Sequence, residues 1–467
     1  MPVLAVPTLA IQQRFTSKII FSEQYSRLSR QIIMKKNTVK SAIVSVSLSV
    51  FVFFGVLPAN AVQPLADIEA FKSIMIDGRD IAKALGKPIA TLSLAAIIDD
   101  ELEPIPYQFD EYNEGGAIFF EGWDVPIIGI QGVLDDQDKL LFLFKDAGEK
   151  KSKAQRFDGT PLAELSITGR DGITRYVYLM ENSRLRSDEQ YVRYSSEEAL
   201  VETDFYSLSY NQDNHINWKD LSIAGYEGED NPIDGLKFRM ETDVVMNLTS
   251  ISLNNKHIVA TPAGEKVGPI RTTTQMELTV WMFGLPMMLI SMQVHHYPQS
   301  VIYDARVMMP ETRRSMMAKS SVAISIDANQ LLGAAVRTAS GPLEAGIVDG
   351  EVGDIEKSMI EAGVNEKEGR WIWISTNKNL DILTYFDFLG GTNEPLSLVY
   401  DDDKFIENLP ERFPGQLPNV GYSIDGFPEE GFFGFVFSFF FSNGYDGDPR
   451  LFTQQLRVLP DVVVNQI

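Results

Sequence analysis

Short runs of β-branched and aromatic residues, separated by glycine, proline, asparagine and aspartate, recur along most of this chain. Such runs predict strands, because branched and aromatic side chains pack well on a pleated sheet and the residues between them favour turns. We expect an all-β protein whose body is a large antiparallel β-sandwich. The expected strands include residues 127–134, 140–144, 174–180, 242–253, 321–327, 371–376 and 433–441.

Two segments have the spacing of helices instead. In residues 65–86, apolar residues from Leu65 to Met75 recur three and four positions apart, which predicts a short N-terminal helix. Gly86 would end it. Residues 354–363 predict a second short helix.

Residues 278–294 form the longest uncharged apolar stretch of the mature chain. Gly284 and Pro286 interrupt it, and it is short for a membrane-spanning helix. We favour two buried strands joined by a Gly-Leu-Pro turn, and keep a hairpin that dips into a membrane as the alternative.

The start of the chain has the pattern of a secretory leader. Residues 34–61 begin with a basic stretch, continue through an uncharged apolar segment and end in Pro58-Ala59-Asn60-Ala61, a small-residue cleavage site. We expect cleavage after Ala61 and a periplasmic or secreted bacterial protein. Residues 1–33 do not belong to this pattern, so we expect Met34 to be the true start and 1–33 to be an upstream over-call.

Domain boundaries are faint in the remaining sequence. The lysine-rich stretch 149–153 predicts a surface loop between two parts. We expect a helix with a small β module over 62–150 and the large β-sandwich body over 151–467.

Composition limits the partners of this chain. Its 64 acidic and 41 basic residues give a net charge of −23, which repels phosphate backbones and disfavours nucleic acid as a partner. It has no cysteine. That excludes disulfides, thiolate metal sites and cysteine nucleophiles. Phosphate loops, dinucleotide fingerprints, G-x-S-x-G elbows and H-E-x-x-H helices are also absent from the sequence.

Three stretches resemble a known family pattern. Residues 103–110 contain Pro106-Tyr107-Gln108-Phe109-Asp110, residues 135–142 contain Asp136-Gln137-Asp138-Lys139-Leu140, and residues 267–271 read Val-Gly-Pro-Ile-Arg. Together they resemble the motifs of exported bacterial domains of unknown function found near polysaccharide-degradation systems. Those domains are similar to the galactose-mutarotase-like super-sandwich. The resemblance implies an all-β protein that faces carbohydrate, and it adds Arg271 to the candidate ligand-binding residues.

Histidines are scarce, so the candidates for acid–base chemistry are few. Opening a sugar ring needs a histidine acid and a carboxylate base on either side of the ring. His295 or His296, with Glu311 or Glu277 as the carboxylate, are the candidate catalytic residues. We favour the alternative that His295 and His296 end a strand, with one ring in the core and the other in solvent.

Carboxylates are abundant, and one acidic turn has aspartates at alternating positions. Asp135, Asp136 and Asp138 could hold a structural calcium ion, since calcium loops often present oxygen ligands at alternating residues. A solvated turn is the alternative that we favour. Methionines concentrated between Met282 and Met317, near His295 and His296, could also hold Cu(I), but we favour their role as adaptable core residues.

Aromatic residues near polar loops are candidates for stacking on sugar rings. Trp123 and Trp218 are best placed, and His215 lies close to Trp218 in the sequence. For both tryptophans, core and ligand contact remain open. Trp371 and Trp373 alternate within one strand and are expected in the core.

Together these patterns predict an exported protein that interacts with a polysaccharide or oligosaccharide, and we favour binding over catalysis. Whether it is an enzyme stays open. The alternative is a non-enzymatic envelope protein that docks on a membrane or a protein partner through residues 278–294; membrane association is not favoured.

Overall fold

A computed structural model describes most of the chain after the expected leader. The described residues are Glu69, 71–123, 125–229, 231–244, 249–282, 284–308, 317–364, 369–389, 396–403, 416–426 and 432–467. The leader expected at 34–61 lies outside them.

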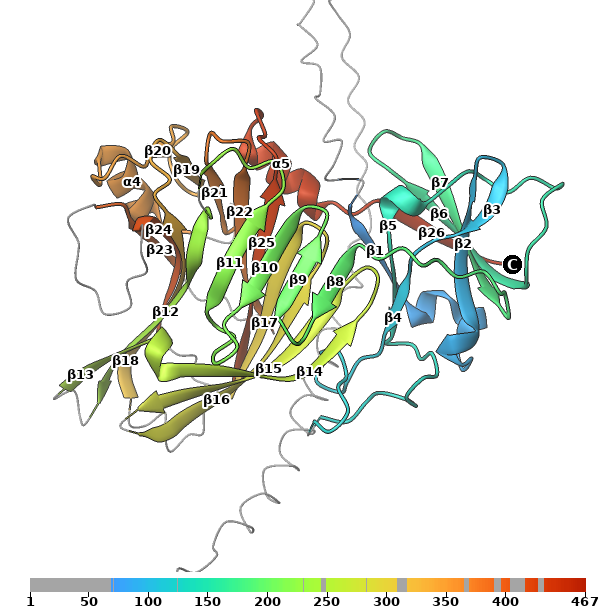
Figure 1. The fold of residues 1–467 in the computed structure, drawn as a ribbon, viewed down its shortest axis with the longest axis horizontal. Coiled ribbons are helices and arrows are strands. Elements are labelled where there is room, and N and C mark those ends of the chain that lie inside the picture. The colour runs from blue at the N-terminus through green and yellow to red at the C-terminus, as the bar shows by residue number, and fades with distance from the viewer. Residues whose placement is uncertain are drawn as a thin grey trace, which may run out of the picture.

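The described chain forms five antiparallel sheets in two lobes (Figure 1). The larger lobe is built on a nine-stranded sheet with one apolar face and one more polar face. On the apolar face, Phe435, Phe437, Phe439 and Phe441 alternate along one strand and are buried. In spatial order the nine strands are β14 (Ile258–Val267), β15 (Thr272–Met282), β16 (Leu285–His296), β17 (Ser300–Met308), β25 (Phe432–Ser442), β22 (Asp381–Leu389), β21 (Trp371–Ser375), β19 (Ala335–Thr338) and β20 (Gly346–Ile347).

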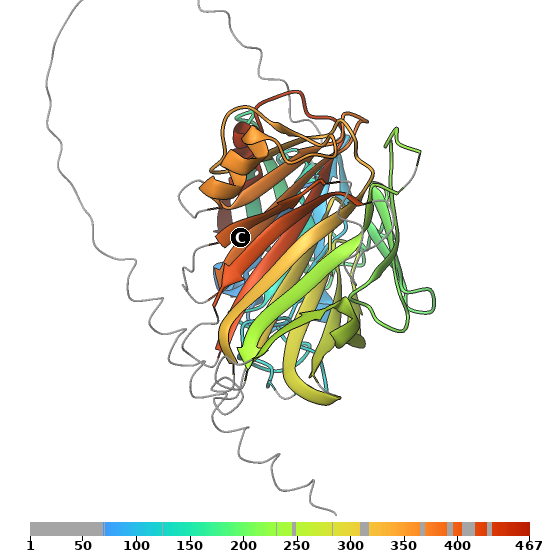
Figure 2. The ribbon, with the colours of Figure 1, turned by 90° about the vertical axis from the view of Figure 1, so that its left-hand side faces the viewer.

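Two smaller sheets cover the apolar face of the nine-stranded sheet. Trp218 of the four-stranded sheet packs edge-to-face on Phe439, and Tyr422 of the five-stranded sheet packs on Phe437. Figure 2 shows strands of the five-stranded sheet running side by side. The first sheet is β11 (Trp218–Ile223), β10 (Tyr206–Tyr210), β9 (Leu200–Thr203) and β8 (Val192–Ser195); the second is β13 (Thr249–Asn254), β12 (Ile233–Val244), β18 (Met317–Asn329), β24 (Gln416–Asp425) and β23 (Leu396–Asp401). The predicted all-β sandwich is confirmed.

The smaller lobe packs two sheets around a second apolar core. One of them joins strands from both sides of the boundary expected at residue 150, and its edge strand is the last strand of the chain (Figure 1). The sheets are β1 (Ser73–Asp77), β5 (Lys139–Leu143) and β4 (Gln108–Asp110), and β26 (Asp461–Gln466), β6 (Thr160–Thr168), β7 (Thr174–Glu181), β2 (Leu92–Ile98) and β3 (Glu101–Pro104).

Little of the described chain is helical. The helices are α4 (Asp354–Ala362), which confirms the helix predicted over 354–363, and α5 (Pro449–Arg457). Short 3₁₀ turns cover Gly78–Asp80, Ala82–Ala84, Ile89–Thr91, Phe144–Asp146 and Asn255–His257. No helix among the described residues is long and apolar enough to span a membrane.

The helix predicted over 65–86 is wrong where the structure describes it. Residues Ser73–Asp77 are strand β1, paired with β5. Ile74 and Ile76 are buried while Met75 is 43% exposed, so burial alternates with period two. Pairing with a distant strand outweighs the local helical spacing.

Two predicted strands also differ. Residues 127–134 make only isolated bridges, because Gly129 and Gly132 take positive φ angles that turn the chain. Residues 242–253 were expected to be one strand. They contain the end of β12 and the start of β13, which pair with each other as a hairpin.

The apolar stretch 278–294 folds as the favoured interpretation predicts. It contains parts of β15 and β16, which pair with each other, and Gly284 takes the positive φ of a turn. Val280, Met288 and Met292 are buried, whereas Trp281 is 39% exposed near the turn.

Candidate functional site

The second face of the nine-stranded sheet carries polar residues along its length. Register pairs Gln293 with Asp304, and Arg337 with Trp373, and all four side chains project from this face. At the β15–β17 end, the segment from Gln108 to Phe120 covers the face. At the β19–β21 end, the face opens into a cleft beside α5.

At the covered end, two of the family-like motifs come together. Gln108 Oε1 accepts hydrogen bonds from the backbone N–H groups of Ile270 and Arg271 at 3.1 and 2.8 Å. The guanidinium of Arg271 forms an ion pair with Asp110 and donates to the Tyr297 hydroxyl at 2.6 Å. Arg271 is 4% exposed. Its contacts therefore join the two lobes through buried, paired charges.

The same covered end holds His295. Thr273 Oγ1 and His295 Nδ1 are 3.0 Å apart, and the ring is buried. Burial, with help from the nearby Arg271 and Arg306 cations, holds the pKa of His295 well below its usual range. Arg306 pairs with Asp304 at 3.0 Å, and Gln293 donates to the Ile118 carbonyl at 2.7 Å. His295 thus lies neutral under the covering segment.

His296 points to the opposite, apolar face. Its Nδ1 and Nε2 atoms lie 3.2 and 3.1 Å from the hydroxyls of Tyr206 and Tyr210. Burial lowers the pKa of His296 to about 3, so the ring is neutral. The Tyr210 hydroxyl is also 3.4 Å from that of Tyr303.

His215 and Trp218 belong to this same buried network. The His215 ring stacks on Tyr210 with centroids 6.0 Å apart, and burial lowers its pKa. The Trp218 indole N–H donates to the Tyr303 hydroxyl at 2.8 Å. Both are buried. The structure therefore brings His215, Trp218 and His296 together, but inside the core and not in an open cleft.

Asp135, Asp136 and Asp138 form a tight turn next to β5. Asp138 accepts the backbone N–H of Asp135 at 2.9 Å, and burial raises the pKa of Asp138 to about 6. Asp135 in turn accepts the N–H of Gln137 at 2.8 Å. Among the described residues, no cluster of three or more histidine, aspartate or glutamate side chains is arranged to hold a metal ion. Calcium at this turn stays a prediction.

Two further candidates remain. Trp123 is half-buried in the long loop between β4 and β5. Glu311 lies outside the described residues, so its pairing with His295 or His296 stays a prediction.

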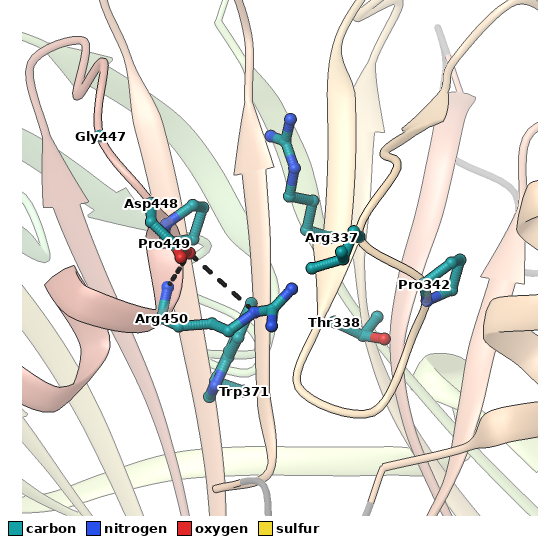
Figure 3. Close-up of a pocket in the computed structure, with 9 residues that line it drawn as sticks. Arg337, Thr338, Pro342, Trp371, Gly447, Asp448, Pro449 and Arg450 are labelled. Atoms are coloured by element: carbon teal, nitrogen blue, oxygen red, sulfur yellow. Dashed lines mark hydrogen bonds and ion pairs between the residues drawn. The ribbon is translucent and has the colours of Figure 1, made fainter.

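The open cleft at the other end has a volume of about 220 Å³ (Figure 3). Trp371 of β21, only 3% exposed, lines it with the edge of its ring. One wall is β19 with the loop that follows, and the other is the start of α5. The side chains that line it include Arg337, Pro342, Leu343, Asp448 and Arg450.

Local sequence explains how α5 forms this wall. Asp448 is the N-cap, its Oδ1 accepts the backbone N–H of Arg450 at 2.9 Å, and Pro449 occupies the first turn. Phe452 of the same helix is fully buried and packs on Trp373 with ring centroids 4.7 Å apart. This aromatic contact holds α5 against the sheet, and it therefore sets the backbone position of Arg450.

Two arginines line the cleft from different walls, Arg337 from β19 and Arg450 from α5, and their guanidinium groups point in different directions (Figure 3). Among the residues that the structure describes, no hydrogen bond or ion pair engages Arg337. Arg450 reaches only an exposed carboxylate, with Nε 4.0 Å from Asp448. The cleft thus offers hydrogen-bond donors beside the apolar surfaces of Pro342 and Leu343.

Sequence reasoning did not identify this cleft. It placed Trp371 in the core, which is correct for most of the ring, and it singled out neither arginine. Arg337 lies on a short strand and Arg450 follows a helix cap, about 110 positions later in the chain. Only the signal Asp448-Pro449, a helix start, was present in the sequence.

No protein-family model matches the chain, and no curated protein matches it. Among solved structures, an α-mannosidase from Enterococcus faecalis V583 aligns over 85% of this chain with 9% identity and a TM-score of 0.44. The α-N-acetylgalactosaminidase NagBb from Bifidobacterium bifidum aligns over 53% with 10% identity and a TM-score of 0.35. The Slr1438 protein from Synechocystis sp. PCC 6803 aligns over 57% with 10% identity and a TM-score of 0.33.

The chain spans 44% of the mannosidase, 36% of the galactosaminidase and all of Slr1438. At these TM-scores neither a fold family nor an activity transfers to this chain. The resemblance to galactose-mutarotase-like domains stays a prediction.

Proposed function

We propose that this protein is an exported carbohydrate-binding protein that holds its ligand in the cleft between β19 and α5. The observation that carries the proposal is the composition of that cleft. The guanidinium donors of Arg337 and Arg450 stand beside exposed apolar surface, and Leu343 is 74% exposed. A sugar presents the complementary pattern, with hydroxyl groups around its rim and C–H groups on its faces.

Binding is favoured over catalysis because of where the titratable groups lie. Acid–base catalysis on a sugar needs a titratable group within hydrogen-bond reach of the reacting oxygen. His215, His295 and His296 are buried, and none of them lines the cleft. The carboxylate that does line it, Asp448, is engaged as the cap of α5.

Export is supported by the sequence of residues 34–61, whose basic start, apolar segment and Ala-Asn-Ala end have the order of a cleavable leader. An exported binding protein can encounter polysaccharide fragments. Because this chain has no cysteine, it has no thiol that could be oxidised outside the cytoplasm. Determining the N-terminal residue of the protein recovered from the periplasm tests this part; Val62 is the expected residue.

The binding test begins with a glycan array probed with the purified protein, followed by calorimetric titration with the oligosaccharides that bind. Leu343→Ala should weaken binding several-fold, because each buried CH₂ group contributes about 0.8 kcal/mol. Leu332→Ala is the matched control, since Leu332 is also an exposed leucine, 55% accessible, and does not line the cleft. A protein that binds no saccharide, or whose two variants lose affinity equally, would contradict the proposal.

A reducing-end assay on the same oligosaccharides separates binding from hydrolysis. The proposal expects no release of new reducing ends over hours at micromolar protein. Turnover that survives in Leu343→Ala but disappears in His295→Gln would show that the covered end of the sheet is an active site.

A further inference from the structure

We propose that the saccharide recognised in the cleft is acidic, and that its carboxylate is held by Arg337 with Arg450 as the second donor. This inference rests on the proposed function and adds the class of ligand. Guanidinium is the side chain best suited to a carboxylate, since its planar fork can donate two parallel hydrogen bonds to the two oxygens.

Arg337 differs from the arginines that pair with carboxylates. In this chain of 64 acidic residues, Arg271 pairs with Asp110, Arg306 with Asp304, and Arg175 with Asp171. Within the placed part of the chain, Arg337 has no such partner although it is half-buried. A half-buried guanidinium with no counter-charge among the described residues is available for an external one.

The two cations line the same cleft from different elements. Arg337 projects from the polar face of the sheet, since it pairs in register with Trp373, whose ring packs under α5. Arg450 extends from the first turn of α5 across Trp371, and the two guanidinium groups point in different directions (Figure 3). A carboxylate in the cleft would therefore lie near positive charge from two elements.

The charges that line the cleft favour an anion even though one of them is negative. The two guanidinium groups face the single carboxylate of Asp448, and Asp448 already accepts the backbone N–H of Arg450. Asp448 is also half exposed, at 51% of its side chain, so solvent screens it. The remaining lining groups that the argument uses, Pro342, Leu343 and Trp371, are uncharged.

The test uses pairs of ligands that differ only in charge. Oligomers of galacturonic, glucuronic and mannuronic acid are compared with the same oligomers after reduction of every carboxyl to a hydroxymethyl group. Calorimetry should show at least one acidic oligomer binding about tenfold or more tightly than its reduced form, as expected for a charge-assisted hydrogen-bonded contact. This preference should shrink as salt rises from 20 to 300 mM.

Variants assign the preference to residues. Arg337→Gln should remove most of the difference between acidic and reduced ligands while keeping the affinity for the reduced form. Arg193→Gln is the matched control. Arg193 is exposed on β8, so this substitution removes the same charge outside the cleft. Circular dichroism and thermal unfolding confirm that both variants fold.

The outcomes separate the two proposals. Equal affinity for acidic and reduced oligomers would overturn the acidic ligand and leave saccharide binding intact. Failure of every saccharide, neutral ones included, would overturn saccharide binding and the inference with it. Competition by a sulfated neutral oligosaccharide as strong as by the uronate would overturn the assignment to a carboxylate, and an equal loss in Arg193→Gln would overturn the assignment to Arg337.

Discussion

At the scale of single residues, the buried polar side chains around His296 form hydrogen bonds with one another. His296 lies between the hydroxyls of Tyr206 and Tyr210, and the Trp218 N–H reaches Tyr303. A polar group that is buried without a partner costs free energy, so such a network specifies one packing of the two sheets. The chemistry of these residues is structural in this account.

Replacing His296 with leucine tests that role. The change leaves two tyrosine hydroxyls without their imidazole partner, and we expect the free energy of unfolding to fall by about 2–4 kcal/mol. Adding Tyr210→Phe should recover part of this loss, because the second hydroxyl is then removed as well. Urea denaturation of the two single variants and the double variant measures the coupling. Additive losses would contradict the network.

Asp146 gives a prediction about pH. Its Oδ1 accepts the Tyr191 hydroxyl at 2.7 Å, while burial raises the pKa of Asp146 to about 6. Because this folded-state pKa is above the unfolded value, protonation stabilises the folded protein, and that contribution is lost as the pH rises through about 6. When the pH is lowered from 7.5 to 5, the free energy of unfolding of the wild type should rise by about 1 kcal/mol relative to that of Asp146→Asn.

The control for this measurement is Asp158→Asn. The backbone N–H of Arg184 and the Ser183 hydroxyl hold the pKa of Asp158 below its usual range, so Asp158 does not titrate between pH 7.5 and pH 5. Its difference from wild type should stay constant over this interval. A constant difference for Asp146→Asn as well would show that the carboxyl is not perturbed.

At the scale of elements, the last strand of the chain completes a sheet of the smaller lobe. Strand β26 pairs with β6 from Asp461 to Gln466, and Val462 and Val464 pack against the core of the smaller lobe. Lys72 reinforces the link, since its ammonium donates to the carbonyls of Gln455 and Val458, both at 2.6 Å. Both ends of the described chain therefore stabilise the same lobe.

A matched pair of substitutions tests the face that β26 buries. Val464→Asp should destabilise the smaller lobe by about 1–3 kcal/mol, because it places a charge against the apolar core. Val463→Asp should change little, since Val463 is 58% exposed. Hydrogen exchange of the β6 amides reports on this lobe directly. Equal protection in both variants would contradict the register.

Element by element, the sequence predicted what local pattern controls. Helix α4 was predictable because Gly353 and Gly363 lie at its two ends. The β15–β16 hairpin was predictable because Gly284 takes the positive φ of its turn. Strand β1 was not, because its apolar residues fit helical spacing and only pairing with β5 makes them a strand. Local periodicity does not record a partner that lies more than sixty positions away.

At the scale of the whole molecule, the two faces of the nine-stranded sheet have different roles: one forms the core and the other carries the cleft. Its apolar face is closed by two smaller sheets and provides the main core. Its polar face is covered at one end by the segment from Gln108 to Phe120 and is open at the other beside α5. A positive cleft on an acidic protein concentrates an anionic ligand at one place, because the remaining surface repels it.

The candidate site itself was beyond sequence reasoning. The chosen residues were rare types, and rarity directed attention to His215, His295, His296 and the tryptophans. Most of these proved to be buried, because rings with a polar edge also join sheets in a core. Arg337 and Arg450 are common residues. Arg337 stands out because no described carboxylate pairs with it, and Arg450 because it reaches only the exposed Asp448, which only the folded arrangement shows.

The most direct test of saccharide binding in the cleft is a crystal structure of the protein soaked with the uronic-acid oligosaccharide that binds most tightly in solution. The account predicts electron density for a sugar against Leu343 and Trp371, with its carboxylate within about 3 Å of the Arg337 guanidinium. Sugar density over the β15–β17 end, beside His295, would contradict it.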